Sequence, residues 1–221
     1  MSVASAFVPP AAVSDVMPSA ALLPIQGGAP GRGDKFRTYT GRLVELLRPT
    51  VNDISLEDIA RHLSKVQRFG GATRAEFYSV AEHSVLVSRL CLPRNALLGL
   101  LHDASEAYIG DVVTPLKRQL ASYKAIEAAW MTAIGIAAGV DNALAHLPSD
   151  IKAADAIALS TERRDVFGGL GIASDSPRPS TLRVRGLRPW KAYELFMERF
   201  AELTGQRPSA IIRRPLRQRA R

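Results

Sequence analysis

The chain has 221 residues, of which 47% are hydrophobic, and this length supports one domain with a substantial core. Its net charge of +8 is concentrated at one end, because six arginines and no acid lie in 207–221, which leaves +2 for the rest. The charge therefore does not indicate a uniformly basic fold, and the single cysteine, Cys91, excludes an intramolecular disulfide. We expect a cytoplasmic protein without a membrane anchor, since neither a secretory leader nor an apolar run of about 18 residues is present.

Both ends of the chain differ in composition from the middle. Residues 1–36 are rich in Ala, Pro, Val, Ser and Gly and show no helical period, so we predict a disordered N-terminal extension. Residues 206–221 form a basic C-terminal tail, also predicted to be disordered. Its arginines could contact nucleic-acid phosphates weakly without any fold. One folded domain is therefore expected over 37–205.

Between the tails, apolar residues recur every three or four positions, which is typical of amphipathic helices. Helices are predicted from residue 55 to just before Gly70 and over 79–92, 94–109, 122–138, 149–168 and 189–204, with a short one after Thr114-Pro115. The alternating run Thr181–Arg185 is a candidate for a single strand or hairpin arm. Because such runs are too few to build a sheet, the predicted class is all-α.

Two of the four histidines lie in helical segments where a structural or solvated role is awkward. His83 follows Glu82, and His102 follows a leucine-rich stretch and precedes Asp103. An imidazole next to a carboxylate at the polar end of a buried helix suits a divalent metal ion. Asp103 can reach the same ion as His102 only if the end of that helix points into the site.

A third element has to complete the coordination. Asp155 lies between small and apolar residues of the predicted helix 149–168, where burial of an unpaired carboxylate would be costly. The sequence therefore predicts a metal ion as its partner. An acid favoured by the N-terminus of the helix is the alternative, although Asp155 lies several residues inside it.

This pattern resembles that of the HD-domain phosphohydrolases, in which a His, a His-Asp pair and a distant Asp lie on separate helices. The likeness to bacterial HD-class 5′-deoxyribonucleotidases and phage deoxynucleoside triphosphohydrolases spans about 38–167 and is more specific than a His-Asp dipeptide. It rests on His102–Asp111, on Thr114–Lys117, on Tyr123–Glu127, and on Arg68-Phe69 fifteen residues before His83, where that family has an Arg-Trp pair.

The resemblance implies an HD-type helical bundle, a nucleotide substrate and a homodimer. It also implies one divalent ion held by His83, His102, Asp103 and Asp155, because dinuclear members have two further histidines before the last Asp and here only His146 intervenes. Mn²⁺, Co²⁺, Zn²⁺, Fe²⁺ and Mg²⁺ all remain open.

The remaining site residues follow from the chemistry of such an ion. Glu106, one turn beyond His102, is expected to position or deprotonate the attacking water, and Asp111 to orient water or a sugar hydroxyl. Arg68 and Lys117 are expected to bind substrate phosphate. Phe69, in place of the family tryptophan, is expected to stack on the sugar or base.

Two functions are therefore weighed. The first is a metal-dependent phosphohydrolase, either a nucleotidase or a deoxynucleoside triphosphohydrolase. The second is a non-catalytic HD module that binds a nucleotide or nucleic acid, which the complete set of ligand residues disfavours. His62 and His146 are interpreted as surface residues, and Trp190 as packing between helices.

Overall fold

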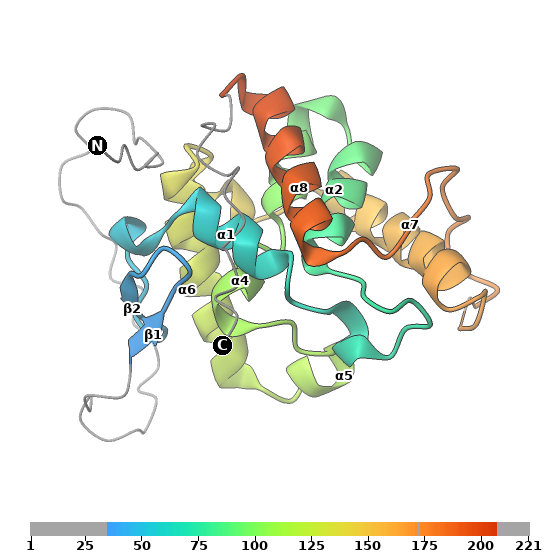
Figure 1. Ribbon diagram of the computed structural model, residues 1–221, viewed down its shortest axis with the longest axis horizontal. Coiled ribbons are helices and arrows are strands. Elements are labelled where there is room, and N and C mark those ends of the chain that lie inside the picture. Colours follow the sequence, from blue (N-terminus) through green and yellow to red (C-terminus); the bar gives the residue numbers. More distant parts are fainter. Residues whose placement is uncertain (1–34, 172, 207–221) are drawn as a thin grey trace, which may run out of the picture.

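The computed structural model describes residues 35–171 and 173–206, and these form a helical bundle with a two-stranded hairpin at one side (Figure 1). The predicted all-α class is confirmed. Most of the predicted N-terminal extension and C-terminal tail lies outside the described residues. The hairpin pairs β1 (Lys35–Arg37) with β2 (Leu43–Glu45) in antiparallel register. Because β1 includes Lys35 and Phe36, the folded domain begins before the predicted boundary at residue 37.

The helices follow one another in the order that the sequence predicts. The α-helices are α1 (Leu56–Leu63), α2 (Val80–Leu90), α3 (Ala96–Leu101), α4 (Glu106–Ile109), α5 (Thr114–Lys117), α6 (Ala121–Ala137), α7 (Ser149–Val166) and α8 (Pro189–Thr204). Short 3₁₀ helices span Val51–Asp53, Arg68–Gly71, Pro93–Asn95 and Asp141–Leu144. In the described part of the chain no helix is long and apolar enough to cross a membrane.

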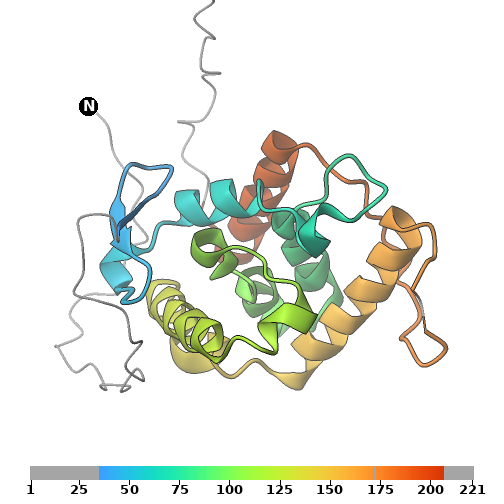
Figure 2. The ribbon, with the colours of Figure 1, turned by 90° about the horizontal axis from the view of Figure 1, so that it is seen from below.

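Helix α2 is the centre of the bundle and is buried along its whole length from Val80 to Ser88. It packs against α3, α7 and α8, which surround it on three sides (Figures 1 and 2). One part of the core joins α1, α2, α6 and α8, and a second part lies between α2 and α7. Close packing around this helix holds its buried polar side chains in fixed positions, and one of them is His83.

Two predicted helices are shorter in the structure. The helix from residue 55 ends at Leu63, because Val66 and Arg68 pair instead with the segment that enters α2: Val80 N donates to Val66 O and Arg68 N to Tyr78 O. The helix predicted over 94–109 is divided into α3 and α4 by a turn at 102–105.

The chemical cause of this division lies at His102. Its Nδ1 bonds to the carbonyl oxygen of Gly99, which would otherwise accept the backbone bond that continues the helix. The turn then closes with tight bonds from Ala104 N to Leu101 O and from Glu106 N to Asp103 O. As a result, His102 and Asp103 both face the interior from the end of α3.

The segment Thr181–Arg185 is not a strand. The N–H of Val184 donates to Asp165 and that of Arg185 to Glu82, so side-chain carboxylates replace a neighbouring strand. This anchored segment leads directly into α8.

Candidate metal centre

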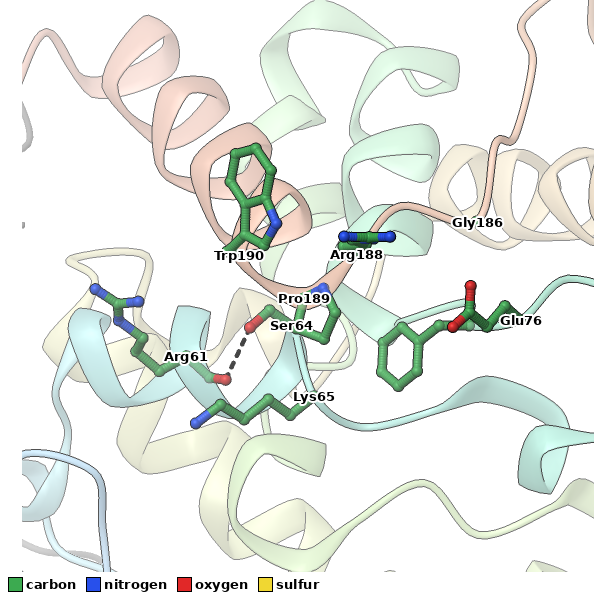
Figure 3. A pocket seen from close by; sticks show the side chains of 9 residues that line it. Arg61, Ser64, Lys65, Glu76, Gly186, Arg188, Pro189 and Trp190 are labelled. Atoms are coloured by element: carbon green, nitrogen blue, oxygen red, sulfur yellow. Dashed lines mark hydrogen bonds between the residues drawn. The ribbon is translucent and has the colours of Figure 1, made fainter. Parts of the chain in front are cut away.

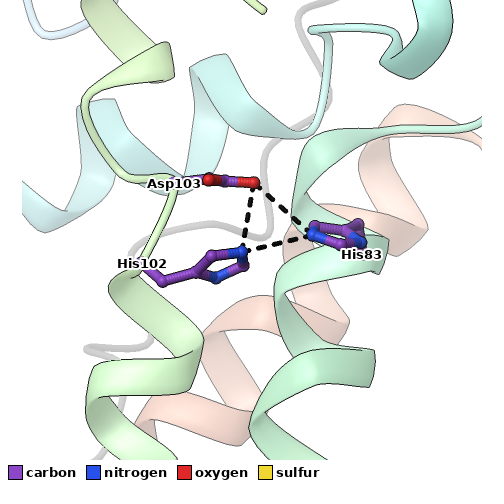
Figure 4. A group of neighbouring side chains, drawn as sticks. All are labelled: His83, His102 and Asp103. Carbon is purple, nitrogen blue, oxygen red and sulfur yellow. Dashed lines mark hydrogen bonds and ion pairs between the residues drawn. The ribbon is translucent and has the colours of Figure 1, made fainter. Parts of the chain in front are cut away.

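Three side chains from α2 and from the end of α3 converge on one point. His83 Nε2 lies 3.3 Å from His102 Nε2 and 3.4 Å from Asp103 Oδ2, and His102 Nε2 lies 3.2 Å from the same oxygen (Figure 4). Bonds of about 2.1 Å to one ion would separate neighbouring ligand atoms by roughly 3.0 Å at right angles and roughly 3.4 Å at tetrahedral angles. The group His83, His102 and Asp103 could therefore hold a metal ion.

The Nδ1 atom of each histidine fixes the orientation of its ring. His83 Nδ1 lies 2.6 Å from Glu162 Oε1, and His102 Nδ1 lies 2.9 Å from the carbonyl oxygen of Gly99. Both partners are acceptors, so both Nδ1 atoms carry the hydrogen and both Nε2 atoms present a lone pair to the cluster. Two lone pairs and a carboxylate that face one another require a cation, either a proton or a metal ion.

Asp155 joins this group from α7. Its Oδ1 lies 3.3 Å from His83 Nε2, the atom that also faces Asp103 and His102. The side chain is 48% exposed, so the sequence argument that burial demands a partner for this carboxylate is wrong. Asp155 lies at the open edge of the cluster. Partial burial raises the pKa of Asp155, but the hydrogen bond and charge of a protonated His83 outweigh it and lower the pKa.

Glu162 belongs to the site but was not predicted from the sequence. It is completely buried on α7, where it accepts hydrogen bonds from His83 and from the Tyr78 hydroxyl at 2.7 Å. Burial raises its pKa, but Arg68 and His83 outweigh burial and lower the pKa to about 2. Glu162 stands seven residues after Asp155, hence on the same face of the helix, and this spacing could have identified it. Such an outer carboxylate orients a metal-binding histidine.

Arg68 connects the two carboxylates on either side of His83. Its Nε lies 3.2 Å from Glu162 Oε1 and its Nη1 lies 3.5 Å from Asp103 Oδ2. Around His83, burial and Arg68 lower the pKa of the imidazole, whereas Glu162, Asp103 and Asp155 outweigh them and raise it well above its usual value. The surroundings of His83 therefore favour a positive charge at the cluster.

The other predicted catalytic residues lie close by. Glu106 begins α4, is 4% exposed, and has one oxygen, Oε2, without a hydrogen-bond partner among the described residues. Burial, Asp103 and Asp111 raise the pKa of Glu106 well above its usual value. Burial also raises the pKa of Asp111, although the charge of Arg68 opposes it. Lys117 Nζ lies 4.0 Å from Glu106 Oε1 but forms its short ion pair with Glu127.

Phe69 follows Arg68 in a strained turn. Its φ of 57° lies in the left-handed region, which costs a non-glycine residue about 1–3 kcal/mol and often marks a functional site. The ring packs edge-on against Phe167, with centroids 5.1 Å apart. The structure thus places Phe69 beside Arg68, with its ring packed against protein.

The structure also shows the positions of Glu82, two further histidines and Trp190. Glu82 does not face the cluster, since its carboxylate accepts N–H groups of residues 185 and 187. His62 is half-buried, not a surface residue, and it bonds to Tyr39 N and Ala107 O. His146 is exposed as predicted. Trp190 is 59% exposed, so its assignment to helix packing is wrong.

The chain is similar to known bacterial proteins. The chain is 37% identical over 179 residues to the uncharacterized protein YfdR of Escherichia coli (strain K12), covering 79% of this chain and 98% of that one. The chain belongs to the YfdR family. An uncharacterized protein of Rhodobacter capsulatus, RCAP_rcc00048, is 36% identical over 163 residues, covering 68% of this chain and 83% of that protein. No protein-family model matches the chain.

Proposed function

We propose that this member of the YfdR family is an HD-type, metal-dependent phosphohydrolase that cleaves phosphate esters of nucleotides. The observation that carries the proposal is the meeting of two imidazole lone pairs and the Asp103 carboxylate at 3.2–3.4 Å, with both Nδ1 atoms held by acceptors. This donor set fits a divalent cation, with Asp155 as the fourth ligand at the open edge.

A divalent ion bound here would polarise a phosphoryl oxygen and lower the pKa of a bound water molecule. The chain's own residues supply the rest. Glu106, a buried carboxyl group with a raised pKa and a free oxygen, holds or accepts the proton of the attacking water. Arg68 and Lys117 provide positive charge for the substrate phosphate, and Asp111 orients water or a sugar hydroxyl. Phe69 shapes the place of the sugar or base.

Hydrolysis can be tested with a panel of nucleoside mono- and triphosphates and each of the five candidate metal ions, with products identified by mass. We expect release of phosphate, pyrophosphate or triphosphate that stops with EDTA. Asp103→Ala should abolish both turnover and metal binding. Asp175→Ala, at an exposed position whose side chain forms no hydrogen bond or ion pair among the described residues, is the matched control and should leave both unchanged. Full activity of Asp103→Ala would refute the proposal.

The same panel separates the catalytic function from a nucleotide-binding module. A module would bind nucleotides without turnover under every metal, whereas the catalytic proposal requires a product in at least one combination. The number of phosphates released defines the substrate as a mono- or triphosphate. Sedimentation of the full chain tests the homodimer that the sequence resemblance implies.

A further inference from the structure

Two pockets, whose linings share no residue with the metal centre, lie along the segment that enters α8. The Trp190 pocket has a volume of about 560 Å³ and is lined by Arg61, Ser64, Lys65, Glu76, Phe77, Gly186, Arg188, Pro189 and Trp190 (Figure 3). The Arg89 pocket, of about 480 Å³, is lined by residues of α2, of α8 and of 181–187, among them Arg89, Arg183, Arg185 and Lys191. Each volume is in the range of small-ligand sites.

The charge of these pockets is strongly one-sided. Four exposed cations line them without an ion pair among the described residues: Lys65, Arg89, Arg185 and Arg188. Only two acids line the pockets. The carboxylate of one of them, Glu82, is buried and already accepts the N–H groups of Arg185 and Leu187, which leaves the exposed Glu76. We call this surface the basic band.

The tryptophan in the band is unusually accessible. Trp190 is 59% exposed at the first turn of α8, while the chain's other tryptophan, Trp130, is fully buried and stacked on Tyr108. Trp190 lines one pocket together with Lys65 and Arg188, and Lys191 Nζ lies 5.7 Å from the centre of its ring. An exposed indole in such basic surroundings offers a stacking surface for a planar base, with cations nearby for the phosphates. Because both pockets are lined by residues of 185–188, the binding surface is longer than a single nucleotide needs.

From these observations we infer that the basic band binds single-stranded nucleic acid, with a base stacked on Trp190 and the backbone phosphates contacted by Lys65, Arg185, Arg188 and Arg89. This site lies on the folded domain and differs from the basic tail at 207–221. Its side chains are also distinct from the metal ligands: Glu82 holds residues 185 and 187 of the band, while its neighbour His83 faces the metal centre.

The test uses the full chain in EDTA, so that hydrolysis at the proposed active site cannot contribute. Labelled 20-nucleotide DNA and RNA single strands are titrated by fluorescence polarisation. The variant Arg185→Glu/Arg188→Glu should bind at least about tenfold more weakly and lower the salt slope by about 1.4, two contacts at about 0.7 each. The control Arg48→Glu/Lys124→Glu makes the same charge change at exposed positions outside the band and should change affinity less than about twofold.

Tryptophan emission supplies a second measurement that the tail cannot mimic. Binding should quench the emission of Trp190, Trp190→Ala should lose this quenching, and its affinity should fall about tenfold. If polarisation rises without quenching of tryptophan emission, the nucleic acid binds to the tail, and the inference is overturned. If the band variant and the control variant lose the same affinity, bulk charge is the cause, and the inference is overturned as well. Equal affinity for duplex DNA or for a mononucleotide would overturn it as well. Thermal unfolding verifies that each variant is folded, and Trp190→Ala tests the band even if the double variant is not.

Discussion

Substitution of Glu162 tests whether an outer carboxylate controls the metal centre. Glu162→Gln keeps the shape of the side chain and removes the charge that faces His83 and Arg68. The pKa of Glu162 falls from 4.5 to about 2, a difference of 2.5, and at about 1.4 kcal/mol for each pKa unit the ionised carboxylate contributes roughly 3–4 kcal/mol. We expect the free energy of unfolding at pH 7 to decrease by roughly this amount.

The same variant should bind the metal ion about 10- to 100-fold more weakly, because His83 loses the partner that fixes its tautomer and orientation. Urea unfolding in EDTA and calorimetric metal titration measure the two effects separately. Since the folded-state pKa of Glu162 is depressed, its stabilising contribution exists above pH 4.5 and disappears as the pH falls towards 2. Glu198→Gln, at an exposed position, is the control. Wild-type metal affinity in Glu162→Gln would refute the positioning role.

Three further predictions concern other parts of the chain. Glu106→Gln should retain metal binding in calorimetry but lower kcat by about 10²- to 10⁴-fold, and unchanged turnover would exclude it as the acid or base. Burial raises the pKa of Asp165, but its bonds with Arg164, Val184 and Arg183 outweigh burial and lower it to about 2. Because solvent screens these ion pairs, the ionised carboxylate should stabilise the fold at pH 5 by only roughly 1 kcal/mol. The stability difference from Asp165→Asn in urea unfolding should shrink as the pH falls towards 2, and a constant difference would contradict this. Gly135→Ala should lower the melting temperature although alanine favours helices, because its Cβ would collide with the Asp141 carbonyl oxygen.

The helices were predictable because their ends carry local signals. Ser55 and Ser79 each accept a backbone N–H at a helix start, Pro148 is the N-cap residue of α7, and Pro189 is the first residue of α8. Such signals act within a few residues, so the order of helices can be derived from one sequence. The division of the helix predicted over 94–109 depends on a side-chain bond to Gly99, which periodicity does not report.

The candidate site was predictable in part. The pair His102-Asp103 and the separate His83 stand out as polar residues in apolar helices, and the structure brings all three together. The exposure of Asp155 and the burial of Glu162 depend on which face of α7 meets α2, and hydrophobic spacing alone does not fix this. Trp190 was misassigned for a related reason: an aromatic residue at a helix start reads as core unless its neighbours in space are known.

The central helix explains how two different surfaces arise from adjacent residues. Successive residues of an α-helix point about 100° apart. Glu82 therefore holds residues 185 and 187, which shape the basic band, while His83 turns towards Asp103 and Asp155. Because α2 is buried from Val80 to Ser88, neither side chain can exchange its partner without disturbing the core. A loss of Glu82 should therefore weaken the band and leave the metal ligands in place, whereas a loss of His83 should do the reverse.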